Sequence, residues 1–113
     1  MLEESGITHA YFHAPLDDAE FGTSASLGKK LGMGGLEKVM PYAEIYYGGV
    51  IGEIEPVDFN VFRERLTDIL AEQVRCYQNN ENPVRKVAVA AGGGNMTTEM
   101  RIAAEAGCDT YVT

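Results

Sequence analysis

The chain has 113 residues, of which 45% are hydrophobic and 23% charged, a composition typical of one globular domain with a single core. Its net charge of −8, without a clustered basic patch, argues against nucleic acid or an anionic membrane as a partner. No apolar run approaches the roughly 20 residues that span a bilayer, and no signal-peptide pattern opens the chain, so we expect a cytoplasmic protein.

The first predicted element is a strand over residues 7–12. These residues are rich in β-branched and aromatic types, and Gly6 before them has the position of a glycine that ends a helical turn. His13 follows the strand directly, and Asp17 lies four residues further on, past a turn at Pro15. The strand is therefore expected to bring a histidine and an aspartate to one edge of a sheet.

A short helix and a long β region come next. A helix is predicted over residues 23–31, with a threonine or serine as its cap and Gly32 at its end. Gly34-Gly35 is expected to form a turn. Residues 42–55 have the composition of strands, and we expect Gly48-Gly49 to interrupt them as a hairpin turn or a bulge.

The longest predicted helix covers residues 59–77, with Asp58 as its cap. Its apolar side chains recur at steps of three and four, which indicates core packing. They are Phe59, Phe62, Leu66, Ile69, Leu70, Val74 and Tyr77. Cys76 falls in this helix and Cys108 lies before the last strand, so both cysteines are interpreted as small buried hydrophobes of a reducing compartment.

The last thirty residues have the order strand, glycine-rich turn, helix, strand. The first of these strands is a near-continuous apolar run, as expected where both faces of a strand are covered. The expected ranges are 84–91 for the strand, 97–106 for the helix and 109–113 for the last strand. This order is a βαβ unit with parallel strands. We therefore predict a single α/β domain over residues 1–113, with a mixed sheet, flanking helices and a C-terminal βαβ unit.

His13 and Asp17 are the first candidates for chemistry, because ligands of open α/β sheets collect beyond the carboxyl ends of the strands. Imidazole and carboxylate groups suit zinc, manganese or iron. A turn histidine followed by an aspartate that caps a helix explains the same spacing equally well, and two ligands alone make no tight site. His9 would lie about 13 Å from His13 along an extended strand, so we expect it at the surface.

Gly92, Gly93 and Gly94 form the second candidate, a loop along which a ligand could approach. Backbone N–H groups at the start of the following helix suit an anion. The loop lacks the GxGxxG spacing and the lysine of a P-loop, so it is no nucleotide fingerprint. A tight structural turn between a strand and a helix explains the three glycines as well.

Five segments occur in an order that is more specific than any one of them. They are His13-Ala-Pro-Leu-Asp17, Leu27-Gly-Lys-Lys-Leu-Gly32, Gly49-Val-Ile-Gly52-Glu-Ile, Val87-Ala-Val-Ala-Ala-Gly-Gly-Gly94 and Ala106-Gly-Cys-Asp-Thr-Tyr-Val-Thr113. Together they resemble the central part of the NIF-three-like family, the NGG-one-interacting factor three homologues, which are also described as GTP cyclohydrolase one type two homologues.

The resemblance implies two similar α/β halves with a two-metal site in the cleft between them, and a homo-oligomer that builds from dimers to hexamers. It implies that Asp17 bridges two divalent ions and that His13 lines the same site. The family's other ligands are a His-His pair before this region and a His with a Glu after it, and the chain has neither. We therefore expect a central fragment of a longer protein, or a naturally shortened member, with an incomplete metal site.

Two hypotheses for the function follow. In the first, the intact protein is a metal-dependent hydrolase in which two divalent ions activate a bridging water, acting on a nucleotide or phosphate ester. The chain alone would then have little or no activity. In the second, the chain is a non-catalytic interaction or regulatory module that self-assembles or binds a protein partner through exposed sheet edges and apolar surface.

Overall fold

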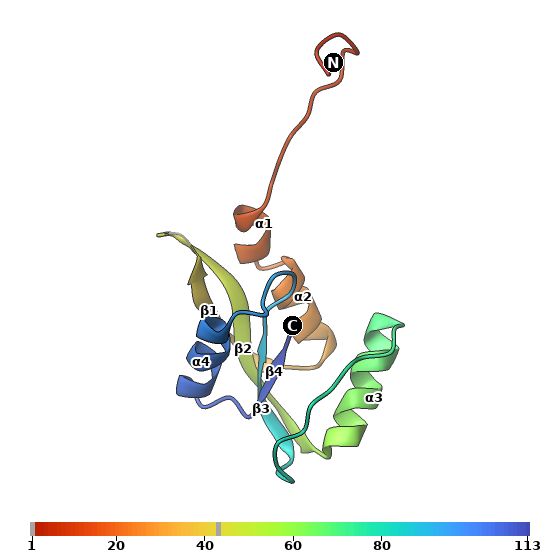
Figure 1. The fold of residues 1–113 in the computed structure, drawn as a ribbon, viewed down its shortest axis with the longest axis vertical. Helices are drawn as coiled ribbons and strands as arrows, with labels where there is room; N and C mark the ends of the chain where they lie inside the picture. Colours follow the sequence, from red (N-terminus) through yellow and green to blue (C-terminus); the bar gives the residue numbers. More distant parts are fainter. Residues whose placement is uncertain (1, 43) are drawn as a thin grey trace.

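Four strands form one mixed sheet, in the order β1-β2-β3-β4, in the computed structural model, which describes residues 2–42 and 44–113 (Figure 1). The strands are β1 (Gly34–Tyr42), β2 (Tyr46–Val57), β3 (Val84–Val89) and β4 (Thr110–Val112). The pairs β1–β2 and β2–β3 are antiparallel, whereas β3 and β4 are parallel and joined through helix α4 (Thr97–Glu105). The predicted fold class and the C-terminal βαβ unit are confirmed.

Helices cover both faces of this sheet. On one face, helices α2 (Thr23–Lys30) and α3 (Phe59–Leu70) pack on alternate residues of β3, which include Val87 and Val89. On the other face, Ala88 packs in a second cluster with Ala103 of α4. Figure 1 shows α4 and α3 on opposite sides of the sheet. Because successive strand side chains point to opposite faces, coverage of both faces explains the apolar run over residues 87–89, whereas Arg85 is exposed and Lys86 half-buried near the start of β3.

The hairpin between β1 and β2 lies at a different place from the one predicted. The chain reverses between Tyr42 and Tyr46, which pair with each other, whereas Gly48 and Gly49 lie inside β2. A Cβ atom on Gly49 would lie 2.5 Å from the sulfur of Met40 and 2.8 Å from the carbonyl oxygen of Val89. Gly49 is therefore required by close packing inside the sheet and not by a turn.

The start of β1 is also different from the prediction. Gly34-Gly35, expected as a turn, belongs to β1, where the pairing with β2 shifts register between Gly34 and Glu37. Gly35 has a φ of +61°, which glycine adopts at bulges without strain. The whole strand over residues 34–41 was missed because its glycines and proline suppress the usual strand pattern.

Helix α3 begins as predicted but ends early. The Asp58 side chain accepts a hydrogen bond from the Asn60 N–H at 2.8 Å and caps the helix. Phe62 and Leu66 of the predicted stripe are buried. The helix ends before Ala71, which has left-handed backbone geometry, and the chain continues as an irregular connection to β3. The predicted helix over residues 71–77 is therefore wrong.

The two cysteines differ in their surroundings. Cys76, predicted to be buried in the helix, is an exposed free thiol on the irregular connection after α3. Cys108 packs against the second cluster of the core, and burial raises the pKa of its thiol. The prediction of a small buried hydrophobe is therefore wrong for Cys76, whereas Cys108 is only partly exposed.

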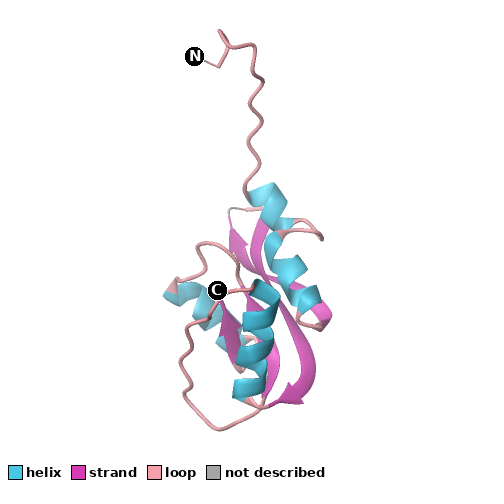
Figure 2. Cartoon of the chain, turned by 90° about the vertical axis from the view of Figure 1, so that its right-hand side faces the viewer, coloured by secondary structure: helices cyan, strands magenta, loops and turns pink. Residues whose placement is uncertain are grey.

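Residues 7–12, predicted as a strand, run away from the folded body without regular structure (Figures 1 and 2). Ile7, Tyr11 and Phe12 are 57%, 76% and 71% exposed. Strand propensity measures how well side chains fit a pleated, half-buried surface, and no strand lies alongside this segment among the described residues. The chain then forms a short helix, α1 (Ala14–Asp18), where a proline turn was expected.

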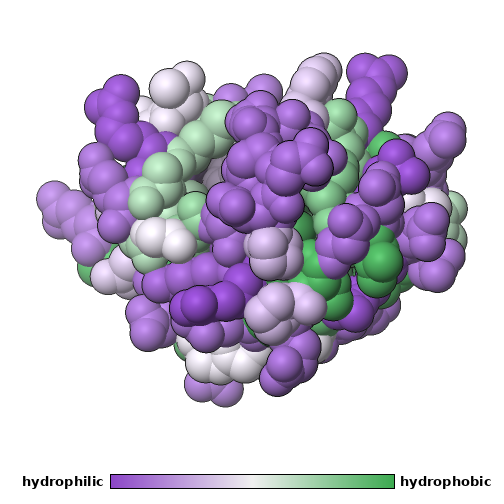
Figure 3. All heavy atoms as spheres, turned by 90° about the horizontal axis from the view of Figure 1, so that it is seen from below, coloured by the Kyte–Doolittle hydropathy of each residue, from purple (hydrophilic) through white to green (hydrophobic). Residues whose placement is uncertain are grey.

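Polar side chains cover most of the molecule's end that lies far from this N-terminal segment (Figure 3). Smaller apolar areas show between them in that view. Among residues 2–42 and 44–113, no helix has the length and apolar character needed to cross a membrane.

Ser24 joins three elements in the centre of the fold. Its hydroxyl donates to the Gly48 carbonyl oxygen of β2 at 3.0 Å and accepts from the Ala91 N–H, just after β3, also at 3.0 Å. Ser24 is 1% exposed, so water cannot take over either hydrogen bond if its hydroxyl is removed. This one side chain therefore holds α2 against the ends of two strands.

We predict that Ser24→Ala lowers the free energy of unfolding by about 1–3 kcal/mol, because it leaves two buried backbone groups unpaired. Ser26→Ala is the matched control. Ser26 lies on the same helix as Ser24, and its hydroxyl donates to the Phe21 carbonyl oxygen in an exposed hydrogen bond. Its cost should stay below about 1 kcal/mol. Urea unfolding monitored by circular dichroism measures both values. Equal effects of the two substitutions would contradict the role assigned to Ser24.

Candidate functional site

His13 and Asp17 face each other at the start of the folded body. His13 immediately precedes α1 and Asp17 lies within it, four residues later, so their side chains fall on the same side of the helix. The His13 Nε2 and Asp17 Oδ2 atoms are 3.9 Å apart. The Tyr42 ring meets the His13 ring edge to face, with centroids 6.2 Å apart. The structure thus brings together the two residues predicted to hold a metal.

The other carboxylate oxygen of Asp17, Oδ1, accepts a hydrogen bond from Thr23. Thr23 Oγ1, at the start of α2, donates to Asp17 Oδ1 at 3.1 Å, which leaves Oδ2 directed at His13. The next residue, Asp18, points elsewhere: it accepts from Lys38 Nζ at 3.0 Å and from the Tyr47 N–H at 3.2 Å. One carboxylate of α1 therefore anchors the helix on the β1–β2 hairpin, and the other faces the site.

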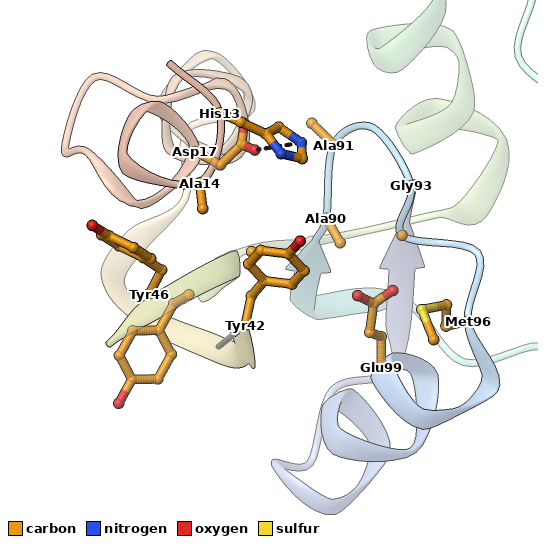
Figure 4. A pocket seen from close by; sticks show the side chains of 13 residues that line it. His13, Ala14, Asp17, Tyr42, Tyr46, Ala90, Ala91, Gly93, Met96 and Glu99 are labelled. Atoms are coloured by element: carbon orange, nitrogen blue, oxygen red, sulfur yellow. Dashed lines mark ion pairs between the residues drawn. The ribbon is translucent and has the colours of Figure 1, made fainter. Parts of the chain in front are cut away.

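A cavity of about 180 Å³, which we call the site cavity, opens beside this pair (Figure 4). Its lining comes from α1, the β1–β2 hairpin, the end of β3, the glycine loop and α4. The lining residues are His13, Ala14, Asp17, Tyr42, Tyr46, Tyr47, Gly48, Ala90, Ala91, Gly93, Gly94, Met96 and Glu99. Segments from the two ends of the chain therefore meet at one cavity.

The glycine loop, the second candidate from the sequence, borders the same cavity. Gly93 and Gly94 line it, whereas Gly92 does not and instead has a φ of +86° in the turn. A Cβ atom on Gly94 would lie 2.5 Å from the Ala90 carbonyl oxygen. Packing alone thus explains Gly94, and left-handed geometry explains Gly92.

Glu99 and Tyr111 were missed by the sequence reasoning. The Tyr111 hydroxyl donates to the Gly94 carbonyl oxygen and so holds the glycine loop onto β4. Burial, followed by the charge of Glu99 and a hydrogen bond with its side chain, raises the pKa of Tyr111 to about 12. The Glu99 Oε2 atom is fully enclosed and has no hydrogen-bond partner among the described residues.

A signal for Glu99 was present in the sequence, because it falls in the first turn of the helix that follows the glycine loop. The hairpin tyrosines carried no such signal, since their position depends on where the hairpin turns. His9, predicted at the surface, is exposed on the extended N-terminal segment. Within residues 2–42 and 44–113, no three His, Cys, Asp or Glu side chains are grouped closely enough to hold a metal ion.

Comparison with known proteins identifies the family. A family profile described as Duf34/NIF3 (NGG1p interacting factor 3) matches residues 1–113. A search of curated proteins found no significant match.

Solved structures share the fold. The protein ybgI, of unknown function, is 24% identical with a TM-score of 0.72, over 88% of this chain and 38% of ybgI. The hypothetical protein SA1388 of Staphylococcus aureus is 16% identical with a TM-score of 0.76, over 97% of this chain and 49% of that protein. Reduced HcgD from Methanocaldococcus jannaschii is 20% identical with a TM-score of 0.70, over 97% of this chain and 42% of HcgD. The chain thus spans less than half of each of these relatives.

The raised pKa of Tyr111 predicts a loss of stability in alkali. Because the folded-state pKa of about 12 exceeds the ordinary value of 10.0, folding favours the neutral phenol. This contribution is complete below pH 10 and is lost as the pH rises towards 12. The free energy of unfolding should therefore fall over this range in the wild type, and less steeply in Tyr111→Phe. Unfolding by urea at a series of pH values measures the difference.

Absorbance titration of the phenolate provides a direct check. The difference curve between the wild type and Tyr111→Phe should have its midpoint near pH 12. Tyr77→Phe serves as the control for the loss of one chromophore, since Tyr77 is 90% exposed. A Tyr111 midpoint at the ordinary value of 10.0 would contradict the burial assigned to its hydroxyl.

Proposed function

Because the chain belongs to the Duf34/NIF3 family, we propose that His13 and Asp17 form part of a divalent-metal site in a metal-dependent hydrolase. The observation that carries this proposal is the 3.9 Å separation of His13 Nε2 and Asp17 Oδ2. Two ligand atoms of a tetrahedral zinc ion lie about 3.4 Å apart, given metal–ligand bonds of about 2.0–2.1 Å. A small side-chain adjustment is enough to bring both atoms onto one cation.

The surroundings of the pair support this proposal. A ligating carboxylate is usually held by a second hydrogen bond, and Thr23 supplies one to Asp17. The Tyr42 ring restricts the orientation of the His13 imidazole. The donor set of one imidazole and one carboxylate suits zinc, manganese or iron. Catalytic zinc takes three protein ligands, so this pair is an incomplete set and the chain alone should bind metal weakly.

A divalent cation lowers the pKa of a bound water and polarises a bound substrate oxygen, which is the chemistry of hydrolysis. In this proposal, Asp17 holds the positive charge in place, and Thr23 prevents its carboxylate from turning away. In the family resemblance, Asp17 bridges two such ions and the substrate is a nucleotide or another phosphate ester. The other ligands of each ion would come from outside these 113 residues.

We predict that Asp17→Asn weakens zinc or manganese binding about 100-fold or abolishes it, because the amide removes the charge and keeps the shape. Thr23→Val should weaken binding about tenfold by releasing the carboxylate. Glu20→Gln is the matched control, since it removes a carboxylate charge three residues away, in the exposed turn after α1, and should leave the affinity unchanged. Isothermal titration calorimetry on the 113-residue chain measures all four affinities.

An unchanged affinity in Asp17→Asn would refute the metal site. Tight, stoichiometric metal binding by the wild-type chain would contradict the incomplete ligand set, although it would leave Asp17 as a ligand.

The exposed N-terminal segment favours a second candidate function, a non-catalytic module that self-assembles or binds a protein partner. Tyr11 and Phe12 are 76% and 71% exposed, which is unusual for adjacent aromatic side chains in an isolated molecule. Residues 8–12 also lie exposed outside regular secondary structure, where their backbone groups are accessible, and β1 and β4 are the outer strands of the sheet. Strand addition to a further chain would cover these groups. Homo-oligomerisation is the form of assembly that the family resemblance suggests.

For this candidate we predict that the wild-type chain associates as its concentration rises and that the double variant Tyr11→Ser, Phe12→Ser does not. The two serines remove the apolar surface and leave the folded body unchanged. Tyr77→Ser is the control, because it removes an aromatic side chain that is 90% exposed at another place. Sedimentation velocity measures the three mass distributions. A monodisperse wild-type monomer at high concentration would rule out self-assembly.

A further inference from the structure

The lining of the site cavity is acidic and aromatic. It contains the carboxylates of Asp17 and Glu99 and three tyrosines of the hairpin, whereas none of the described lining residues is a lysine or an arginine. Phosphate groups in proteins are bound mainly by arginine, lysine and backbone N–H groups. The first turn of α4 also carries the Glu99 carboxylate, whose negative charge disfavours a second anion beside it.

Glu99 lies at the end of the cavity opposite His13 and Asp17, the proposed metal ligands. In Figure 4 its carboxylate points into the cavity, which the Tyr42 ring and the pair formed by His13 and Asp17 also line. Its Oε2 atom has no hydrogen-bond donor among the described residues. The Tyr111 hydroxyl has a single proton, for which the Gly94 carbonyl oxygen and the Glu99 side chain compete, and Glu99 Oε2 is left without a donor.

Leaving an enclosed carboxylate oxygen without a hydrogen-bond donor costs free energy, because the oxygen has lost its water and gained no partner. The terminal torsion of a glutamate is broad, so a rotation of the carboxylate can present this oxygen to the cavity without moving α4. The donor must then come from a bound molecule or from solvent. Tyrosine faces attract cations, and Tyr42, which is 55% exposed, stands beside Glu99 at the cavity.

We propose that the side of the cavity formed by Tyr42 and Glu99 binds a positively charged nitrogen that carries N–H donors, as in an ammonium, amidinium or guanidinium group. The cavity, of about 180 Å³, is smaller than the about 300–1,000 Å³ of pockets for drug-sized ligands, so it holds one head group and not a whole nucleotide. As an assignment of substrate class the inference rests on the proposed function, whereas the cation site itself needs no metal.

The test uses three molecules of the same shape and different charge: benzamidinium, benzamide and benzoate. Each is titrated into the 113-residue chain in the presence of a chelator, and backbone amide shifts in NMR spectra give the affinity and the place of binding. Benzamidinium should bind at least about tenfold more tightly than benzamide, with shifts at Tyr42 and the first turn of α4. Benzoate should bind more weakly than benzamide.

Glu99→Gln removes the charge and keeps the shape, so it should reduce the preference for benzamidinium over benzamide to nearly one. Glu105→Gln is the matched control, because it makes the same change at the exposed end of the same helix and should keep the preference. Tyr42→Leu should weaken benzamidinium binding several-fold. Since Tyr42 is more than half exposed, this variant tests the site even if Glu99→Gln does not fold.

Benzoate binding as tight as benzamidinium binding, a preference that survives Glu99→Gln, or no binding of any of the three would each overturn the proposal. Because the titration excludes metal, its failure leaves the zinc affinities of Asp17→Asn and the wild type to decide the metal site separately. Conversely, unchanged zinc binding in Asp17→Asn would refute the metal site and leave the cation site standing.

Discussion

The hydroxyl of Ser24 is the contact on which the arrangement of the site depends. It connects α2 to the backbone of β2 and to Ala91, two residues after the end of β3. These three elements lie far apart in the sequence. Both of its partners, Gly48 and Ala91, also line the site cavity. Thr23, the next residue towards the N-terminus, holds Asp17. A buried hydrogen bond in the core therefore sets the position of the His13–Asp17 pair relative to the far side of the cavity.

The sequence predicted those elements whose apolar pattern reflects their own environment. Strand β3 is covered on both faces and is apolar except at Arg85 and Lys86, and α3 carries a capping aspartate before its stripe. The errors concern features decided by distant residues. Gly49 is a glycine because Met40 and Val89 lie against it, which no local pattern shows. Residues 7–12 have strand propensity but no neighbouring strand among the described residues, and pairing, not propensity, makes a strand.

The sequence named His13, Asp17 and the glycine loop as candidates, but it did not show how they would be brought together. His13 and Asp17 were expected after a strand, but no strand precedes them among the described residues, and they face each other because they lie four residues apart at α1. The glycine loop does follow a strand, β3, as the chain order indicates. Their meeting at one cavity is a tertiary fact. Tyr42 enters the cavity only because the hairpin turns between residues 42 and 46, four residues before the expected place. Glu99 acquires a role only because β4 brings Tyr111 beside the glycine loop.

The two proposed functions meet at the junction of the exposed segment and the site. Tyr11 lies with its ring centroid 6.1 Å from that of His13, so the apolar segment and the metal pair are physically adjacent. A chain that packs on residues 7–12 would approach the incomplete ligand set from its open side, since His13 is 61% exposed there. Covering the segment would also shield the His13–Asp17 pair from water, and electrostatic interactions strengthen as water is excluded. If both proposals hold, assembly and metal binding are coupled, and each favours the other by the same free energy.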